Sequence, residues 1–287
     1  MALGAKKGGR MSAKSKIEWC DATWNPVQGC NPISLGCQNC YARRIAERFR
    51  GTPGHPYEFG FDVRYFPSRL DIPSRWKKPK NIFVCSMADL FHSKVPEYVI
   101  DDVFGEMLAN PHHVFFILTK RPERMATYLA NVELFTQRPD VLNHIWFGVS
   151  VEDGPHMERL KVLAGIEGIN RFVSFEPLLG RIHLPEWEDH ISRMDWIICG
   201  AETGPGARMI YASTAFSLKD FAYRHHIPFF FKKWGNREDN GRMPREFPVF
   251  RKAADAVGTN PGENPHNSLM SAPARMGGTM ADGKEGE

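Results

Sequence analysis

Short apolar runs alternate with amphipathic segments along most of the chain. The runs have the length and content of buried strands and lie at residues 81–87, 114–119, 145–151, 171–175, 196–199 and 228–231. The segments between them carry apolar residues at helical spacing and lie at residues 95–109, 122–129, 155–164, 182–191 and 213–225. With a first strand at residues 18–25, this alternation favours an α/β fold with a parallel sheet and right-handed crossovers. Roughly six or seven βα units in one sheet predict an open or partial barrel.

Three parts of the chain lack this alternation. Residues 1–15 are basic and Gly-rich and predict a disordered leader, and residues 251–287 turn to small and polar residues that predict a flexible tail. The connection at residues 51–79 is rich in Pro, Gly and aromatic residues. We interpret it as an insertion that covers a surface or closes over a site. We therefore expect one domain over residues 16–250.

Length and charge limit the class of protein only loosely. The 287 residues carry a formal net charge of +4 with Lys and Arg spread along the chain, so the composition neither demands nor excludes a nucleic-acid partner. No apolar run approaches the roughly 18 residues of a membrane span, and the first residues lack the apolar core of a secretory signal. We therefore expect a cytoplasmic protein with no membrane contact.

The clearest chemical signal is a cysteine cluster near the start of the chain. The segment TWNPVQGCNPISLGCQNCYARR places Cys30, Cys37 and Cys40 at spacing C-x6-C-x2-C, before a helix at residues 41–49. In a reducing compartment such clustering favours metal over disulfides. Three thiolates hold a 4Fe-4S cluster and leave one iron without a protein ligand. That open iron predicts a radical enzyme in which S-adenosyl-L-methionine binds the iron through its amino and carboxylate groups.

Other interpretations of the cysteines stay open. Cys20 could complete a structural zinc site, since four thiolates around one ion leave nothing reactive, and the protein would then be a non-catalytic zinc-binding module. Against this, Cys20 falls on the first strand, and zinc modules more often pair two C-x2-C turns. Cys85 and Cys199 lie inside apolar strands and fit buried structural thiols. A metal-independent nuclease or hydrolase has little support, because no carboxylate cluster or nucleophile motif has a compelling spacing.

With these residues, the sequence resembles a phage-associated and bacterial family of unknown activity that is radical S-adenosylmethionine-like. The matching phrases are TWNPVQGC, SLGCQNCYA, VCSMADLF, ILTKRPERM, IWFGVSVED, RFVSFEPLLG, WIICGAETGPGARM and FFFKKWG. The resemblance implies the superfamily's partial (β/α)6 TIM-like barrel with outer helices, a cluster after the first strand, and cleavage of the cofactor to a 5′-deoxyadenosyl radical. Two features depart from the superfamily pattern: its usual spacing is C-x3-C-x2-C, and Asn39 stands where an aromatic residue is usual.

The resemblance also implies partners and a substrate class. It implies an external electron donor of the flavodoxin or ferredoxin type, and a phage-encoded chain would act in the host cytoplasm with a phage or host partner protein. The zinc alternative would then belong to a phage nucleoprotein complex. The phrase LTKRP is similar to a T-K phrase in the spore photoproduct lyase branch, which repairs a thymine lesion in DNA. This likeness favours a nucleotide or nucleic-acid base as substrate, with Lys120 and Arg121 as catalytic residues.

Polar residues follow the predicted strands, at the edge where βα barrels carry out chemistry. Ser86 and Asp89 suit the methionyl amine of the cofactor, and Ser150 and Glu152 suit its ribose or carboxylate. Glu176 and Glu202 complete the predicted cofactor-binding set. A basic set that could neutralise substrate phosphate comprises Lys120, Arg121, Lys232 and Lys233. Each of these residues could instead cap a helix, pair on the surface or extend into solvent.

Overall fold

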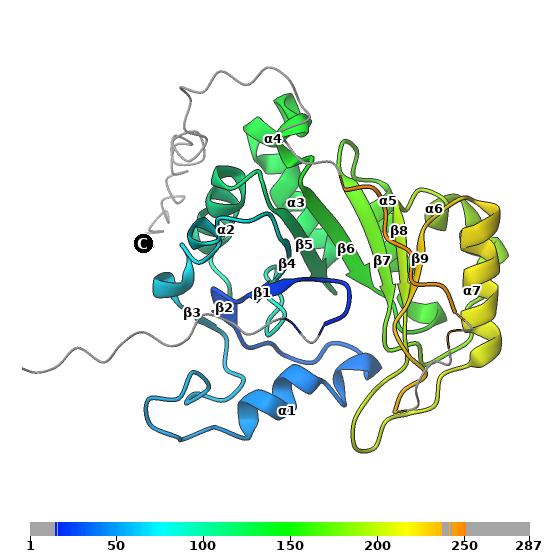
Figure 1. Ribbon diagram of the computed structural model, residues 1–287, viewed down its shortest axis with the longest axis horizontal. Helices are drawn as coiled ribbons and strands as arrows, with labels where there is room; N and C mark the ends of the chain where they lie inside the picture. The colour runs from blue at the N-terminus through cyan, green and yellow to red at the C-terminus, as the bar shows by residue number, and fades with distance from the viewer. Residues whose placement is uncertain (1–14, 16, 237–240, 242, 251–287) are drawn as a thin grey trace, which may run out of the picture.

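The computed structural model describes residues 15, 17–236, 241 and 243–250 (Figure 1). Its centre is a seven-stranded sheet in which all neighbouring strands are parallel and follow one another in chain order. The strands are β1 (Ala22–Trp24), β4 (Asn81–Val84), β5 (Val114–Thr119), β6 (Ile145–Ser150), β7 (Asn170–Phe175), β8 (Trp196–Cys199) and β9 (Phe229–Phe231). The sheet curls into a half-barrel that is compatible with a partial TIM-like fold.

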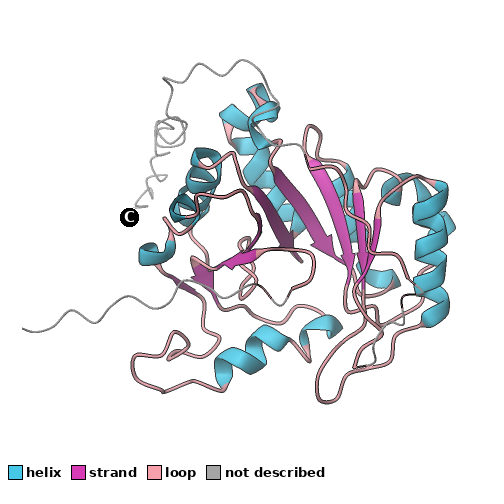
Figure 2. Ribbon diagram, viewed as in Figure 1, coloured by secondary structure: helices cyan, strands magenta, loops and turns pink. Residues whose placement is uncertain are grey.

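Helices connect the strands and flank the sheet (Figure 2). They are α2 (Glu97–Ala109), α3 (Pro122–Asn131), α4 (Glu133–Gln137), α5 (Glu158–Ala164), α6 (Glu188–Ile191) and α7 (Ala212–Arg224). A further helix, α1 (Tyr41–Glu47), lies beyond the carboxyl ends of the strands, on the side toward which the arrowheads of β5 and β6 point in Figure 1. The segment that carries the cysteines therefore lies at the edge where the strands end.

Alternate residues of each strand face opposite sides of the curled sheet, which gives the domain two cores. Outward-facing residues such as Phe115 and Phe147 pack against the helices in the larger core. Inward-facing residues form a smaller, mostly aromatic core that includes Trp19, Phe83, Phe116, Trp146, Phe172, Trp196 and Phe230. These large rings fill the interior of the half-barrel around the middle and amino-terminal parts of the strands.

The inward-facing positions change from aromatic to polar as the strands run toward their carboxyl ends. On β6 the buried ring of Trp146 is followed on the same face by Ser150, and on β7 Phe172 is followed by Ser174. The period of two then brings Glu176 to the same face just beyond β7. The half-barrel is therefore packed below and polar at its carboxyl edge, which is the arrangement that positions the site.

The structure confirms the predicted alternation of parallel strands and helices, with some shifted bounds. β5 and β8 have the predicted residues, whereas β1 is limited to Ala22–Trp24 because Glu18 and Trp19 lie in a turn. All seven predicted strands form, including the last, since β9 pairs with β8 along Phe229–Phe231. That the sheet is of the radical S-adenosylmethionine type stays a prediction.

Several short elements carry no signal in the sequence. β2 (Val27–Gln28) and β3 (Arg64–Tyr65) form a separate antiparallel pair, and α4 follows α3 where no second helix is predicted. Short 3-10 turns lie at η1 (Leu35–Cys37), η2 (Pro67–Arg69), η3 (Pro73–Arg75), η4 (Pro139–Leu142), η5 (Gly154–His156) and η6 (Leu184–Trp187). Two-residue strands and single turns are too short to show a period.

The connection at residues 51–79 lies against α2. The Tyr65 hydroxyl donates to Asp102 (2.8 Å) and the Ser74 hydroxyl donates to Glu106 (2.6 Å). The predicted leader, apart from Ser15, and the predicted tail lie outside the described residues. Within the described part of the chain, no helix has the length and apolar content needed to cross a bilayer.

Candidate functional site

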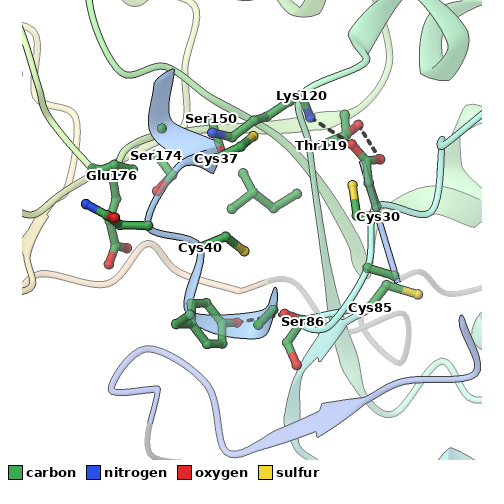
Figure 3. Close-up of a pocket in the computed structure, with 18 of the residues that line it drawn as sticks. Cys30, Cys37, Cys40, Cys85, Ser86, Thr119, Lys120, Ser150, Ser174 and Glu176 are labelled. Atoms are coloured by element: carbon green, nitrogen blue, oxygen red, sulfur yellow. Dashed lines mark hydrogen bonds between the residues drawn. The ribbon is translucent and has the colours of Figure 1, made fainter. Parts of the chain in front are cut away.

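A cavity opens at the carboxyl edge of the sheet (Figure 3). Its volume of about 240 Å³ far exceeds the roughly 10–15 Å³ that one water needs, so the cavity suits an organic ligand or a cluster better than a single ion. The cysteine loop, residues 29–40, and the strand ends line it together. The lining includes Cys30, Cys37, Cys40, Ser86, Asp89, Lys120, Arg121, Ser150, Ser174, Glu176, Glu202 and Lys232.

The backbone at Gly29 fixes the position of Cys30. Gly29 has φ = +88°, and its N–H donates to the carbonyl of Met87 (2.9 Å). A Cβ at this position would lie 2.1 Å from the carbonyl oxygen of Asp62, so only glycine fits. The loop is thereby held between β4 and the 51–79 connection, and Cys30 lies on one side of the cavity with Cys40 on the other (Figure 3).

Cys37 and Cys40 share the tight turn that their C-x2-C spacing predicts. Cys37 ends η1, and the N–H of Cys40 donates to the Cys37 carbonyl (3.4 Å) directly before α1. The three loop thiols therefore lie around one cavity and not at one point. Across the described residues, no three His, Cys, Asp or Glu side chains converge closely enough to hold a metal ion.

Cys20 does not join the loop cysteines. It is buried in the inner core, where its sulfur lies 3.4 Å from the Ser15 hydroxyl. Burial raises the pKa of the Cys20 thiol to about 11. A structural zinc ion needs four ligands around one centre, with sulfurs about 2.3 Å from the metal. The described geometry therefore gives no support to a zinc site completed by Cys20.

Asp89 organises the wall of the cavity next to Cys30. Its buried carboxylate accepts hydrogen bonds from the Thr119 hydroxyl and the Arg121 guanidinium (both 2.7 Å). Arg121 also donates to the sulfur of Cys30 (3.6 Å). Burial, and then the charge of Asp89, raise the pKa of the Cys30 thiol to about 11 although Arg121 opposes them. A thiolate at Cys30 would therefore gain from the further positive charge of a bound metal.

Glu152 lies beneath the cysteine loop and is fully buried. Its Oε1 accepts from the Ser34 hydroxyl (2.6 Å) and from the Lys120 ammonium, and its Oε2 accepts from Arg159 (2.7 Å). Burial alone would raise the pKa of this carboxyl, but the charges of Lys120 and Arg159 hold it below its usual range. Lys120 also lowers the pKa of the Cys37 thiol, against the effect of burial.

Glu202 holds the other end of the cysteine loop. The side-chain amide of Asn39 donates to its Oε2 (2.8 Å), and the guanidinium of Arg208 donates to Oε2 (3.0 Å) and Oε1 (2.5 Å). Arg208 donates in addition to the carbonyl of Leu35 (2.9 Å). The hydrogen bonds from Arg208 and Asn39 lower the pKa of Glu202 to about 2, although burial opposes them.

Two serine hydroxyls that line the cavity have no hydrogen-bond partner among the described residues. They belong to Ser150 and Ser174, which pair with each other across β6 and β7. Neither hydroxyl oxygen is fully buried, so water or a ligand in the cavity can form a hydrogen bond with it. On the neighbouring wall, Lys232 donates to Glu176 (2.5 Å) and both side chains stay partly exposed.

The structure brings most of the predicted site residues together. All of the predicted cysteines, cofactor-binding residues and catalytic residues line the cavity except Glu152, which lies under the loop. Lys120, Arg121 and Lys232 are each ion-paired with a carboxylate, and Lys233 does not line the cavity. The roles assigned to these residues stay predictions.

Five side chains at the site fall outside the predicted set: Ser34, Asn39, Arg159, Ser174 and Arg208. Ser174 could have been found from the strand period, since it lies two residues before Glu176 on the same face. Ser34 and Asn39 lie on the predicted cysteine loop, but their carboxylate partners are 118 and 163 residues away in the chain. Arg208 contacts the loop at Leu35, 173 residues away, so no local pattern indicates these contacts.

Comparison with known proteins gives one clear match. A family described as protein of unknown function, DUF5131, matches residues 14–285. The chain belongs to this family. The expected membership of a family of unknown activity is thereby confirmed, whereas the radical S-adenosylmethionine character of this DUF5131 protein stays a prediction.

Similar solved structures include a point mutant of spore photoproduct lyase. It has a TM-score of 0.43 and 10% sequence identity, over 90% of the DUF5131 chain and 74% of its own. A likeness this distant assigns neither an activity nor a ligand. Among curated proteins, none matches the DUF5131 chain.

Proposed function

We propose that this DUF5131 protein is a radical S-adenosylmethionine enzyme in which Cys30, Cys37 and Cys40 hold a 4Fe-4S cluster. One observation carries the proposal: the three thiols of one loop line a single cavity at the carboxyl edge of a curled parallel sheet. That edge is where βα barrels bind their ligands. The donor set also fits, because three thiolates bind three irons and leave the fourth open.

The three-cysteine donor set suits a cluster better than a single ion. In a 4Fe-4S cluster each cysteine binds a different iron, so the sulfurs stay apart, whereas the ligands of zinc share one centre. Arg121 lies against Cys30, and the charge of Lys120 acts on Cys37. Both cations favour thiolates, which are the form that binds iron, although burial and Asp89 outweigh Arg121 and raise the pKa of Cys30.

The chain's own part in the reaction is to bind and orient the cofactor. When bound, the cluster and S-adenosyl-L-methionine would supply one-electron reductive cleavage of the sulfonium. We assign the free hydroxyls of Ser150 and Ser174 to the ribose hydroxyls, which match them as donors and acceptors. Ser86 offers an acceptor to the methionyl amine from the β4 side, while Asp89 keeps Arg121 beside Cys30.

We further propose a nucleotide or nucleic-acid base as the substrate, supported by the LTKRP phrase. The Glu176–Lys232 pair supplies an acceptor and a donor on one wall, which suits the edge of a base better than a phosphate. Lys120 and Arg121 stand as the catalytic candidates. An external flavodoxin- or ferredoxin-type donor would supply the electron. We also propose a phage or host protein as a binding partner.

The proposal is tested by metal and product analysis. Protein purified without air and reconstituted with iron and sulfide is expected to be brown and to hold about four irons per chain. With dithionite and S-adenosyl-L-methionine it is expected to release 5′-deoxyadenosine. Colourless protein with tightly held zinc, and no product, would overturn the proposal in favour of the zinc-binding module.

Cysteine variants provide the control. Replacement of Cys30, Cys37 or Cys40 by Ala is expected to abolish cluster binding. Cys20→Ala, which removes a thiol that does not line the cavity, is expected to keep the iron content of the wild type. Loss of metal in Cys20→Ala as complete as in the loop variants would contradict a three-cysteine site.

A further inference from the structure

We infer that Glu152 and Glu202 are positioning residues that anchor the cysteine loop from two sides. The inference rests on the proposed function for the role of the loop, but the contacts that carry it belong to the chain alone. For the fully buried Glu152, it replaces the cofactor contact that the sequence predicts.

The Glu152 anchor holds the first half of the loop. The two carboxylate oxygens of Glu152 accept hydrogen bonds from Ser34, Lys120 and Arg159. The carboxylate has no exposed surface left for a ligand. Lys120 also donates to the Ser34 hydroxyl (3.3 Å), which lies 3.5 Å from the sulfur of Cys37. Glu152 therefore fixes both the backbone turn before Cys37 and the cation that acts on its sulfur.

The Glu202 anchor holds the second half. The side chain of Glu202 is only 5% exposed, and its carboxylate accepts a hydrogen bond from the amide of Asn39. Through Arg208 it reaches the carbonyl of Leu35 (2.9 Å) and the side-chain oxygen of Gln38 (3.2 Å). Asn39 directly precedes the cysteine Cys40 in the chain. The residue before Cys40 therefore forms a partly buried hydrogen bond to the carboxylate.

The length of the loop explains why it needs such anchors. Six residues separate Cys30 from Cys37, and each residue whose backbone becomes ordered loses conformational entropy. A longer free loop would spread the thiols over more arrangements. Hydrogen bonds to charged groups are stronger than neutral ones, and two buried carboxylates supply them at both halves of the loop.

Hydrogen exchange in the metal-free chain tests the anchors without any cluster. Glu202→Gln and Glu152→Gln are expected to speed amide exchange in residues 30–40 by about tenfold, the effect of losing one charged hydrogen bond. Asn39→Ala and Ser34→Ala remove the loop partner and leave each buried carboxylate paired with arginine, so they test the same anchors if the glutamate variants fail to fold. The matched control is Glu176→Gln, a cavity-lining carboxylate whose hydrogen bond goes to Lys232 and not to the loop.

The loaded protein gives a second readout. After reconstitution, the anchor variants are expected to hold several-fold less iron than Glu176→Gln and to show a broadened electron paramagnetic resonance signal of the reduced cluster. The inference would be overturned if all four anchor variants exchanged the amides of residues 30–40 at the wild-type rate. It would also be overturned if Glu176→Gln accelerated this exchange as much as they do. If the wild type binds no iron at all, the proposed function fails, while the exchange experiment still decides whether the loop is anchored.

Discussion

Gly36 of the cysteine loop passes directly over Glu152, so closely that a Cβ on Gly36 would lie 2.5 Å from both Cγ and Oε1 of the glutamate. The glutamate cannot move aside, because Lys120 and Arg159 hold its two oxygens. The loop therefore follows a path that only glycine allows at this position, and the same contact buries the carboxylate completely.

Gly36→Ala is expected to displace the loop. An added methyl group in a packed site costs about 1–3 kcal/mol, and here the displacement also moves Cys37, the next residue. We expect a lower free energy of unfolding in urea and less iron after reconstitution. The control is Gly165→Ala, where a Cβ would meet the nearest atom at an ordinary 3.5 Å and the change is expected within about 0.5 kcal/mol. Equal stability of the two variants would contradict the close contact.

Asp89→Asn is expected to destabilise the domain strongly. The change leaves Arg121, whose side chain is 16% exposed, without its carboxylate partner at 2.7 Å. Breaking a buried ion pair from one side costs about 3–5 kcal/mol, because the remaining charge is left uncompensated. Urea denaturation measures the loss.

The matched control for this variant is Asp71→Asn. Asp71 pairs with Arg75 at 2.5 Å, but the two side chains are 61% and 48% exposed. An exposed pair contributes about 0–1 kcal/mol. A loss at Asp89 no larger than the loss at Asp71 would show that the Asp89–Arg121 pair is solvated and does not order the wall beside Cys30.

The sequence predicts the site only as far as local patterns reach. The strand period places Ser150 and Glu152 on one face, and the cysteine spacing places three thiols on one loop. The period cannot show that Glu152 is fully buried and hydrogen-bonded while the Ser150 hydroxyl has no partner among the described residues. One partner of Glu152 is Ser34, which lies 118 residues from it in the chain. Likewise, β2 and β3 form through long-range pairing of two residues each.

Glu202 is expected to make stability depend on acid pH. Its folded-state pKa is about 2 and its ordinary value is 4.5, so between these values the unfolded chain binds more protons. The stabilisation is complete above pH 4.5 and is lost as the pH falls toward 2. We expect the free energy of unfolding to fall more steeply over this range in the wild type than in Glu202→Gln. Parallel curves for the two proteins would show that Arg208 does not favour the ionised form of the Glu202 carboxyl over the protonated form.

Gly148→Ala tests the aromatic floor beneath the cavity. A Cβ on Gly148 would lie 2.4 Å from the ring of Phe172, which fills the half-barrel below Ser150. The clash is expected to cost about 1–3 kcal/mol, measured by urea denaturation. Phe172→Leu makes a cavity and destabilises the domain by itself, but in the double variant the smaller side chain gives the added methyl room. We therefore expect the double variant to lose less unfolding free energy than the two single variants together, by about 0.5–3 kcal/mol. Strict additivity would mean that Gly148 and Phe172 do not pack against each other, and that the floor of the site is held by other rings of the inner core.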